Sequence, residues 1–385
     1  MENVNKRIFG LDLVRCIAIL LVLIAHSDFF FGPVFKDTLI DKALGRLVYY
    51  PFGFYGVEIF FVLSGFLIGR IIIKEIFEQG NWRNLLNFYI RRWFRTLPLY
   101  YLVMLVIFLY PTGAEFSWTN LLFLQNFNSE DLGYYPVTWS LSVEEWFYFT
   151  IPMVMLLYTF LLKNKGPKTF MTICFGIIGI SLALRILMYF YGEQSFDFGT
   201  RKQVFLRMDS LIMGVILAGV KFYFEDIYNY LLSKRKKLLI YSLFGFILCE
   251  IWFAIHNREA LNSSFFSRTI YFNLVSIICS MFMVSMDGIN LPKNKRLVKL
   301  ISTISIISYS LYLLHFKIYA IVSDILTLNN LAIGILGYLL ALSLTIVISF
   351  FVNKYFEIPI MNLRDNIKFL SRDGVKRDVS KAKGA

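Results

Sequence analysis

Charged residues are scarce in this chain. Only 17% of its 385 residues are Asp, Glu, Lys or Arg, whereas 57% are hydrophobic and 18% are aromatic. This apolar excess is larger than a single soluble core can bury, so the composition excludes an ordinary soluble globular protein. We therefore expect a polytopic membrane protein.

Cysteine is also scarce, and its spacing excludes two classes of structure. The four cysteines all fall within apolar runs, where cysteine behaves as a small hydrophobic residue: Cys16, Cys174, Cys249 and Cys279. None of them has the spacing of a zinc site or of a disulfide framework, so we expect no bound metal. We find no internal repeat in the sequence, and we expect no appended soluble domain.

About ten apolar runs are long enough to cross a bilayer, which takes about 20 residues per helix. Their centres lie near Ile19, Phe61, Met104, Met155, Ile177, Ile212, Leu243, Ile277, Leu313 and Leu344. The first run has no small-residue cleavage site after it, so we expect a retained helix rather than a signal peptide. The sequence thus predicts an all-α, polytopic transmembrane helical bundle.

Lys and Arg are distributed unevenly between alternate loops. If the N-terminus lies inside, the inside loops hold 28 of these residues, the outside loops hold 7, and 4 lie within spans. Because positive residues are retained on the cytoplasmic side, we expect both termini there, with a membrane-embedded domain over residues 1–360 and a basic tail over residues 361–385. Topology and contact with anionic membrane lipids explain the net charge of +13, so no nucleic-acid partner is expected.

Two ionisable residues lie within the first apolar run, Leu11 to Phe30. At about 100° per residue, Arg15 and His26 share one helix face and lie about 16 Å apart along the axis. Asp12 lies one turn before Arg15. One interpretation is that Asp12 and Arg15 pair with each other while His26 makes a packing contact. Because ionisable groups inside a spanning helix are costly, we favour a water-accessible cavity that both residues line.

Three carboxylates are expected at about the depth of His26. Glu58 opens the second span on its outer side, and Glu144 and Glu145 open the fourth span, next to Ser142. A carboxylate beside an imidazole fixes its tautomer and stabilises its protonated form, as a general base requires. Which glutamate would partner His26 stays open, and a glutamate pair at a membrane interface often serves only as an anchor.

Basic residues cluster at the predicted inner end of the third span. Arg91, Arg92 and Arg95 precede Pro98, at which we expect a helix to begin. Arg92 and Arg95 lie about one turn apart if this segment is helical. Together with Arg15 they could clamp phosphates, which guanidinium groups bind well. Membrane topology alone explains Arg91 fully and the other two in part.

Later spans contain further polar residues. Arg207 and Asp209 lie within the segment RMDSLIMG, where we expect Arg207 to be paired and Gly214 to allow close helix approach. His315 lies in the late segment ISYSLYLLHFKIY. A lone histidine within a membrane is more often structural than catalytic.

Seven motifs in this order resemble the acyltransferase-3 family of integral membrane acyltransferases: FGLDLVRCIAILLVLIAH, GVEIFFVLSGFLI, FYIRRWFRTLPLYY, TWSLSVEEWFYF, RMDSLIMG, ISYSLYLLH and FEIP. The family's pattern of Arg, ten residues and His matches Arg15 and His26, and its Arg-x-x-Arg matches Arg92 and Arg95. Its Trp-Ser-x-x-x-Glu-x-x-Phe-Tyr pattern matches Trp139 to Tyr148, although the glutamate is doubled here. Glu58 lies in the segment GVEIFF, where many relatives resemble GVDLFF; this chain therefore keeps the carboxylate but on a longer side chain.

The resemblance implies an O-acyltransferase of the bacterial plasma membrane. Such an enzyme moves an acyl group, most often acetyl from cytoplasmic acetyl-CoA, to a hydroxyl of a surface glycan or lipid-linked sugar of the O-antigen, capsule or exopolysaccharide type. The CoA phosphates would dock at Arg15, Arg92 and Arg95. His26, oriented by Glu145, Glu144 or Glu58, would act as general base. Substrate contact or structural support is expected from Asp12, Ser142, Tyr148, Arg207 and His315.

Two alternatives stay open. A polytopic transporter or flippase of a glycolipid or small molecule also has many spans with intramembrane charges, although such proteins commonly show paired helix breaks in two related halves, which this sequence lacks. Transfer could also be direct or pass through a covalent acyl group on a residue such as Tyr148 or Ser64.

Overall fold

The computed structural model describes residues 8–109, 116–127, 132, 134–162, 165–192 and 195–365. Over these residues the chain is helical and has no β-strand, which confirms the predicted all-α class. The α-helices are α1 (Phe9–Ala25), α2 (Asp28–Phe35), α3 (Leu39–Leu44), α4 (Tyr50–Ile71), α5 (Trp82–Leu109), α6 (Trp118–Leu121), α7 (Trp139–Leu162), α8 (Pro167–Tyr191), α9 (Met208–Tyr223), α10 (Glu225–Ser233), α11 (Arg235–Ile255), α12 (Arg258–Ser263), α13 (Phe265–Arg268), α14 (Tyr271–Asp287), α15 (Lys295–Ile325), α16 (Leu331–Val352) and α17 (Ile358–Asp365).

Short helical segments of other geometry join several of these helices. Four are π-helical, namely η2 (Gly45–Tyr49), η3 (Ile72–Phe77), η5 (Asp197–Arg201) and η7 (Asn353–Glu357), and two are 3₁₀-helical, namely η4 (Pro136–Thr138) and η6 (Phe205–Arg207). Through η2 and η3, the helical path around α4 runs without a break from α3 to Phe77.

The predicted membrane spans correspond to helices. Seven helical stretches in the described part of the chain are long and apolar enough to cross a membrane, and they contain α1, α4, α5, α8, α11, α15 and α16. The three other predicted run centres fall within α7, α9 and α14, so all ten centres are helical. Helices α9 and α14 have only 16 and 17 residues. The total of ten spans and the cytoplasmic position of the termini stay predictions.

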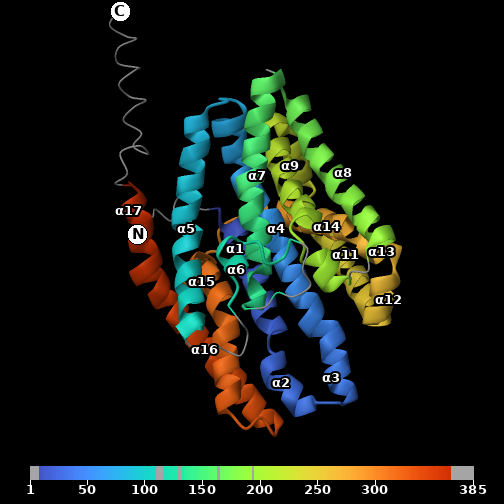
Figure 1. Cartoon of the computed structure of the whole chain (residues 1–385), viewed down its shortest axis with the longest axis vertical. Helices are drawn as coiled ribbons and strands as arrows, with labels where there is room; N and C mark the ends of the chain where they lie inside the picture. The colour runs from blue at the N-terminus through green and yellow to red at the C-terminus, as the bar shows by residue number, and fades with distance from the viewer. Residues whose placement is uncertain are drawn as a thin grey trace, which may run out of the picture.

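The long helices pack side by side in one bundle (Figure 1). Helices α5, α15, α16 and α17 form one side, α8, α11 and α14 form the other, and α1, α4, α7 and α9 lie between them. Helices α2 and α3 lie together at one end of the bundle. Helix α4 packs against α1 and α9, and α1 also packs against α15, so the centre of the bundle joins residues that are far apart in the sequence.

Glycine allows α4 and α9 to approach closely. A Cβ atom at Gly65 of α4 would lie 1.9 Å from the carbonyl oxygen of Leu211, and one at Gly214 of α9 would lie 2.0 Å from the carbonyl oxygen of Val62. Neither position can hold a larger residue without a backbone shift. Small residues at such contacts are the usual means of close helix packing in membranes, as we expected for Gly214.

Four buried charged side chains lie beside this contact. Glu58 of α4 pairs with Arg207 at 2.5 Å, and Arg185 of α8 pairs with Asp209 of α9 at 2.6 Å. Arg207 also lies 3.8 Å from Asp209. Two positive and two negative groups therefore neutralise one another inside the bundle. The expectation that Arg207 is paired is confirmed.

Two predicted boundaries differ from the observed ones. The first helix ends at Ala25, with His26 as its C-terminal cap, rather than running on to Phe30. Pro98 lies inside α5 rather than at its start, because membrane helices tolerate proline where neighbouring groups satisfy the freed backbone. The predicted division at residue 360 stays a prediction: helix α17 runs to Asp365, and residues 366–385 of the predicted tail lie outside the described residues.

We expect Gly65→Ala to destabilise the protein. The added methyl group would meet the backbone of α9, and such overpacking costs about 1–3 kcal/mol. The matched control is Gly176→Ala in α8, where no atom from elsewhere in the described residues lies within 4 Å of the added Cβ and alanine favours the helix by about 1 kcal/mol. Unfolding of both variants in detergent would measure the difference, and equal stability would contradict the close α4–α9 contact.

Candidate active site

His26 lies beside a second buried histidine. His26 Nδ1 is 3.4 Å from His315 Nε2, and the centroids of the two rings are 4.8 Å apart at an interplanar angle of 69°. His315 is carried by α15 and is completely buried. The sequence suggested His315 only as a supporting residue, because nothing in the sequence of α15 indicates that its histidine faces the end of α1.

Hydrogen bonds determine which nitrogen of each ring carries the proton. His315 Nδ1 lies 2.7 Å from the carbonyl oxygen of Tyr312 and 3.1 Å from that of Leu311. Carbonyl oxygens only accept, so in the neutral ring His315 Nδ1 donates, and the lone pair on its Nε2 faces His26. His26 Nδ1 then donates toward this lone pair and toward the Val22 carbonyl oxygen at 2.9 Å. This leaves His26 Nε2 as the basic nitrogen.

His26 lines a cavity of about 380 Å³. We call it the His26 cavity; its charged lining residues are Asp28, Asp197, Arg201, Lys202 and Arg258. The carboxylate in this cavity that is nearest in sequence to His26 is Asp28, at the start of α2. Sequence reasoning missed Asp28, because we expected the first helix to continue through this position.

A second cavity, of about 240 Å³, is lined by all three predicted arginines, Arg15, Arg92 and Arg95. We call it the Arg15 cavity, since Arg15 of α1 lines it together with Arg92 and Arg95 of α5. Arg92 and Arg95 both lie within α5, which confirms that their segment is helical. Three guanidinium groups from two helices are thus brought together, as the phosphate hypothesis requires.

The two cavities are adjacent but distinct. Arg15 lines one and His26 lines the other, so our expectation of a single hollow shared by both residues is wrong in that form. Val57 of α4 and Tyr312 of α15 line both cavities. These two side chains therefore form the boundary between the arginine cluster and the histidine.

Glu144 faces the Arg15 cavity instead of His26. It accepts hydrogen bonds from Ser64 at 2.6 Å and from Tyr148, and it pairs with Arg92 at 3.4 Å. The Arg92 guanidinium also lies over the Tyr148 ring, 3.9 Å from its centroid. Glu144 and Tyr148 therefore hold Arg92 in place, and Glu144 lines the Arg15 cavity rather than the His26 cavity.

The other two predicted carboxylates also have different surroundings from those we expected. Glu58 is bound by Arg207 and by Ser210, whose hydroxyl lies 2.8 Å away, because its charge balances the buried arginine. Glu145 is buried and lines neither of the two cavities. Among the described residues, none of the three glutamates forms a hydrogen bond or ion pair with His26.

The remaining predicted residues have local structural contacts. Asp12 lies 3.8 Å from Arg15, and Ser305 bridges them by accepting from Arg15 at 3.1 Å and donating to Asp12 at 2.7 Å. The pairing interpretation of Asp12 is therefore correct, although Arg15 lines a cavity as well. Ser142 donates to the Thr138 carbonyl oxygen at 3.4 Å, within the first turn of α7.

Asp197 joins two cations in the wall of the His26 cavity. It lies 2.8 Å from Arg201 and 2.6 Å from Lys202. Burial opposes its ionisation, but the charges of Arg201 and Lys202 prevail and hold the pKa of Asp197 below its ordinary value. Burial, together with the charge of Arg201, lowers the pKa of Lys202 to about 8. Sequence reasoning could have singled out Arg201 and Lys202, because few Lys and Arg residues occur in the predicted external loops.

Comparison with known proteins identifies similar chains. The profile of the acyltransferase-3 family, described as an acyltransferase domain, matches residues 8–354. The O-acetyltransferase OatA of Staphylococcus aureus is 28% identical over 337 residues, which cover 80% of this chain and 52% of that protein. Another S. aureus protein, provisionally named an O-acetyltransferase, is 26% identical over 399 residues, which cover 94% of this chain and 58% of that protein. The chain thus spans little more than half the length of these relatives, and no solved structure matches it.

We expect Glu58→Gln to destabilise the protein strongly. The substitution leaves Arg207 buried with only Asp209, which Arg185 already neutralises, and unpairing a buried charge costs about 3–5 kcal/mol. The control is Glu75→Gln, which removes a half-exposed partner 3.9 Å from Arg91 and should cost less than about 1 kcal/mol. Unfolding in detergent measures both. A normally stable Glu58→Gln protein would refute the structural role.

Proposed function

Because the chain belongs to the acyltransferase-3 family, we propose that it transfers an acyl group, acetyl in the first instance, from cytoplasmic acetyl-CoA to a hydroxyl of a cell-surface glycan or glycolipid. The relatives named O-acetyltransferases support transfer to oxygen. The apolar helices support a multi-pass protein, which we propose lies in a bacterial plasma membrane.

The observation that carries the proposal is the His26–His315 pair. Their hydrogen bonds leave His26 Nε2 as a basic nitrogen in a cavity that adjoins the Arg15 cavity. Acyl transfer to a hydroxyl requires a base that removes the hydroxyl proton. His26 Nε2 takes this role, and His315 is a positioning residue that sets the tautomer.

The Arg15 cavity is suited to the acyl donor. Arg15, Arg92 and Arg95 provide guanidinium groups for the CoA phosphates, and Glu144 and Tyr148 orient Arg92 for this contact. The pantetheine arm of CoA carries no charge, so it can continue along the apolar wall formed by Val57 and Phe60. The thioester would then arrive at the boundary between the two cavities, next to Tyr312.

The chemistry balances with one base. His26 Nε2 accepts the proton of the acceptor hydroxyl while the hydroxyl oxygen bonds to the acyl carbon. The carbon–sulfur bond breaks, and His26 Nε2 then passes the proton to the CoA sulfur. The acceptor leaves as an ester and CoA leaves as a thiol. This direct route needs no covalent acyl-enzyme on Ser64 or Tyr148, and both of these hydroxyls donate to Glu144.

We expect His26→Ala to abolish acyl transfer without unfolding the protein. Loss of a general base costs about 10²–10⁴-fold in rate. Membranes supplied with radiolabelled acetyl-CoA should yield labelled glycan with the wild-type protein and none with His26→Ala. A carrier would yield no labelled glycan in either case, which would exclude the enzymatic function. A folded His26→Ala protein of normal activity would exclude His26 as the base.

The positioning role of His315 has its own test. His315→Gln keeps an amide oxygen that can accept from His26 Nδ1, whereas His315→Leu has no acceptor. We expect the turnover of His315→Gln to exceed that of His315→Leu by about fivefold or more, since a net hydrogen bond of this kind contributes about 1 kcal/mol or more. Equal turnover of the two variants, each with normal folding, would contradict the tautomer assignment.

Substitution of the arginines should weaken donor binding selectively. We expect Arg92→Gln and Arg95→Gln each to raise the KM for acetyl-CoA by about tenfold or more, because each removes a charge-assisted contact with phosphate. The matched control is Arg91→Gln, since Arg91 precedes Arg92 on α5 but lines neither cavity. Steady-state kinetics at saturating acceptor measure the effect. An equal rise for Arg91→Gln would indicate a general charge effect instead of a donor site.

A further inference from the structure

A larger cavity, of about 690 Å³, opens beside the His26 cavity. We call it the Arg258 cavity. The two cavities share part of their walls, because both are lined by Gly45, Tyr50, Asp197 and Arg258. The lining residues come from three separate parts of the chain: α3 with η2 and the start of α4, the segment around η5, and the segment from the end of α11 through α12.

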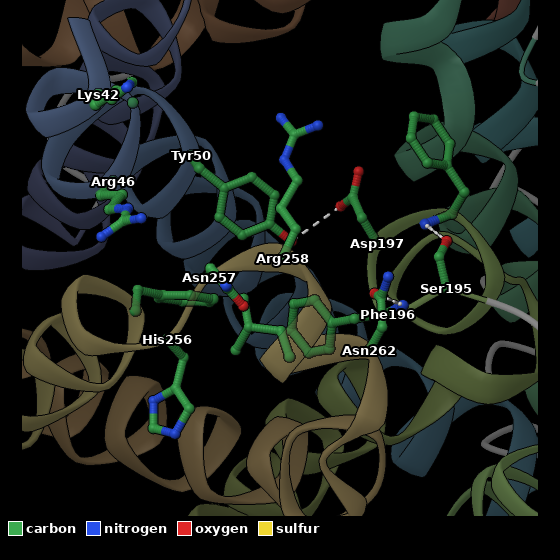
Figure 2. Close-up of a pocket in the computed structure, with 14 residues that line it drawn as sticks. Lys42, Arg46, Tyr50, Ser195, Phe196, Asp197, His256, Asn257, Arg258 and Asn262 are labelled. Atoms are coloured by element: carbon green, nitrogen blue, oxygen red, sulfur yellow. Dashed lines mark hydrogen bonds between the residues drawn. The ribbon is translucent and has the colours of Figure 1, made fainter.

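Uncompensated positive charge lines this cavity. Lys42, Arg46 and Arg258 are exposed there, and none of them forms an ion pair with a described residue. Asp197 is the one carboxylate among the residues that line it, and Asp197 is already paired with Arg201 and Lys202. Figure 2 shows Lys42 and Arg46 on one side of the cavity, Asp197 on the other, and Arg258 between them.

The distribution of external cations makes this cluster informative. Of the seven Lys and Arg residues in the predicted external loops, five line the Arg258 cavity or the His26 cavity: Lys42, Arg46, Arg201, Lys202 and Arg258. Membrane topology disfavours positive residues on this side, so it does not explain why those present converge on one place.

The rest of the wall of the Arg258 cavity consists mainly of aromatic rings and side-chain amide groups. Tyr50, Phe196 and Phe253 present rings to the cavity, and Asn257 and Asn262 present side-chain amides. Tyr50 also donates to Asp197 at 3.0 Å, and Asn262 accepts from the Phe196 backbone at 2.8 Å, so parts of this wall are held in place. A mainly apolar and aromatic wall with a few polar groups is typical of small-molecule sites. The C–H faces of a sugar ring can pack on such rings.

We propose that the Arg258 cavity binds the acceptor, and that the acceptor is a sugar bearing an oxyanion, phosphate or carboxylate, held by Lys42, Arg46 and Arg258. This assignment rests on the proposed function, because it places the acceptor hydroxyl in the adjoining His26 cavity. Guanidinium groups bind both oxyanions through paired hydrogen bonds. Neutral glycans are poorer acceptors on this assignment.

The test measures binding of three soluble probes: glucose, glucose 1-phosphate and glucuronate. The protein is embedded in nanodiscs of phosphatidylcholine, which supply no anionic lipid. The variant is Arg46→Gln/Arg258→Gln, and the control is Lys36→Gln/Arg91→Gln, which removes two positive charges that line none of the three cavities. Titration calorimetry at constant ionic strength gives the affinities.

We expect the wild-type protein to bind at least one anionic sugar about tenfold or more tightly than glucose, since each lost charge-assisted contact accounts for about this factor. The preference should disappear in the Arg46→Gln/Arg258→Gln variant and persist in the control. A preference for glucose 1-phosphate identifies phosphate as the recognised group, and a preference for glucuronate identifies carboxylate. Equal or absent binding of all three probes to the wild-type protein, or a preference that survives in the variant, overturns the assignment.

The outcome is separable from that of the proposed function, because the binding measurement needs no acyl transfer. If the binding pattern is observed but radiolabelled acetyl-CoA yields no labelled glycan, the acyltransferase function fails and the anionic-sugar site stands. If glycan is labelled but the anionic sugars show no preference, the function stands and the acceptor assignment fails.

Discussion

Neutralisation of buried charge is the constraint on which the rest of this structure depends. Lipid solvates ions poorly, so a charge inside the bundle is costly unless another charge within contact distance balances it. The pairs Glu58–Arg207 and Arg185–Asp209 meet this requirement between α4, α8 and α9. Because none of these helices can shift without unpairing a charge, the close contact at Gly65 is maintained. Helix α4 also carries Val57, so the same constraint positions the boundary between the two central cavities.

The same requirement explains why His26 has no glutamate beside it. Glu58 and Glu144 are each committed to an arginine, and a carboxylate that balances a buried guanidinium is not available to a neutral imidazole. His26 is instead oriented by His315, a neutral group that imposes a tautomer without adding a charge. The basic nitrogen is therefore selected by the direction of hydrogen bonds, at a lower desolvation cost than an ion pair would require.

How far the site could be predicted depends on whether its residues share a local pattern. Arg92 and Arg95 lie one helical turn apart, and their clustering with Arg15 was expected from spacing and from positive charge at one end of two spans. Asp28 was missed, since the end of the first helix at Ala25 left no clear signal in an apolar run. The Arg258 cavity was missed as well, because its cations come from segments about 210 residues apart and each looks like an ordinary loop residue by itself.

The sequence by itself determined that the chain is an all-helical membrane bundle, which segments form its long helices, and which family it resembles. These properties follow from apolar run length and from motifs that are contiguous in the chain, where position in sequence and position in space are nearly the same. Only the tertiary structure decided that His26 meets His315, that Glu144 meets Arg92, and that Arg15 and His26 line separate cavities. Such contacts depend on how each helix is rotated about its axis and which neighbour it faces, and that is set by packing across the whole bundle.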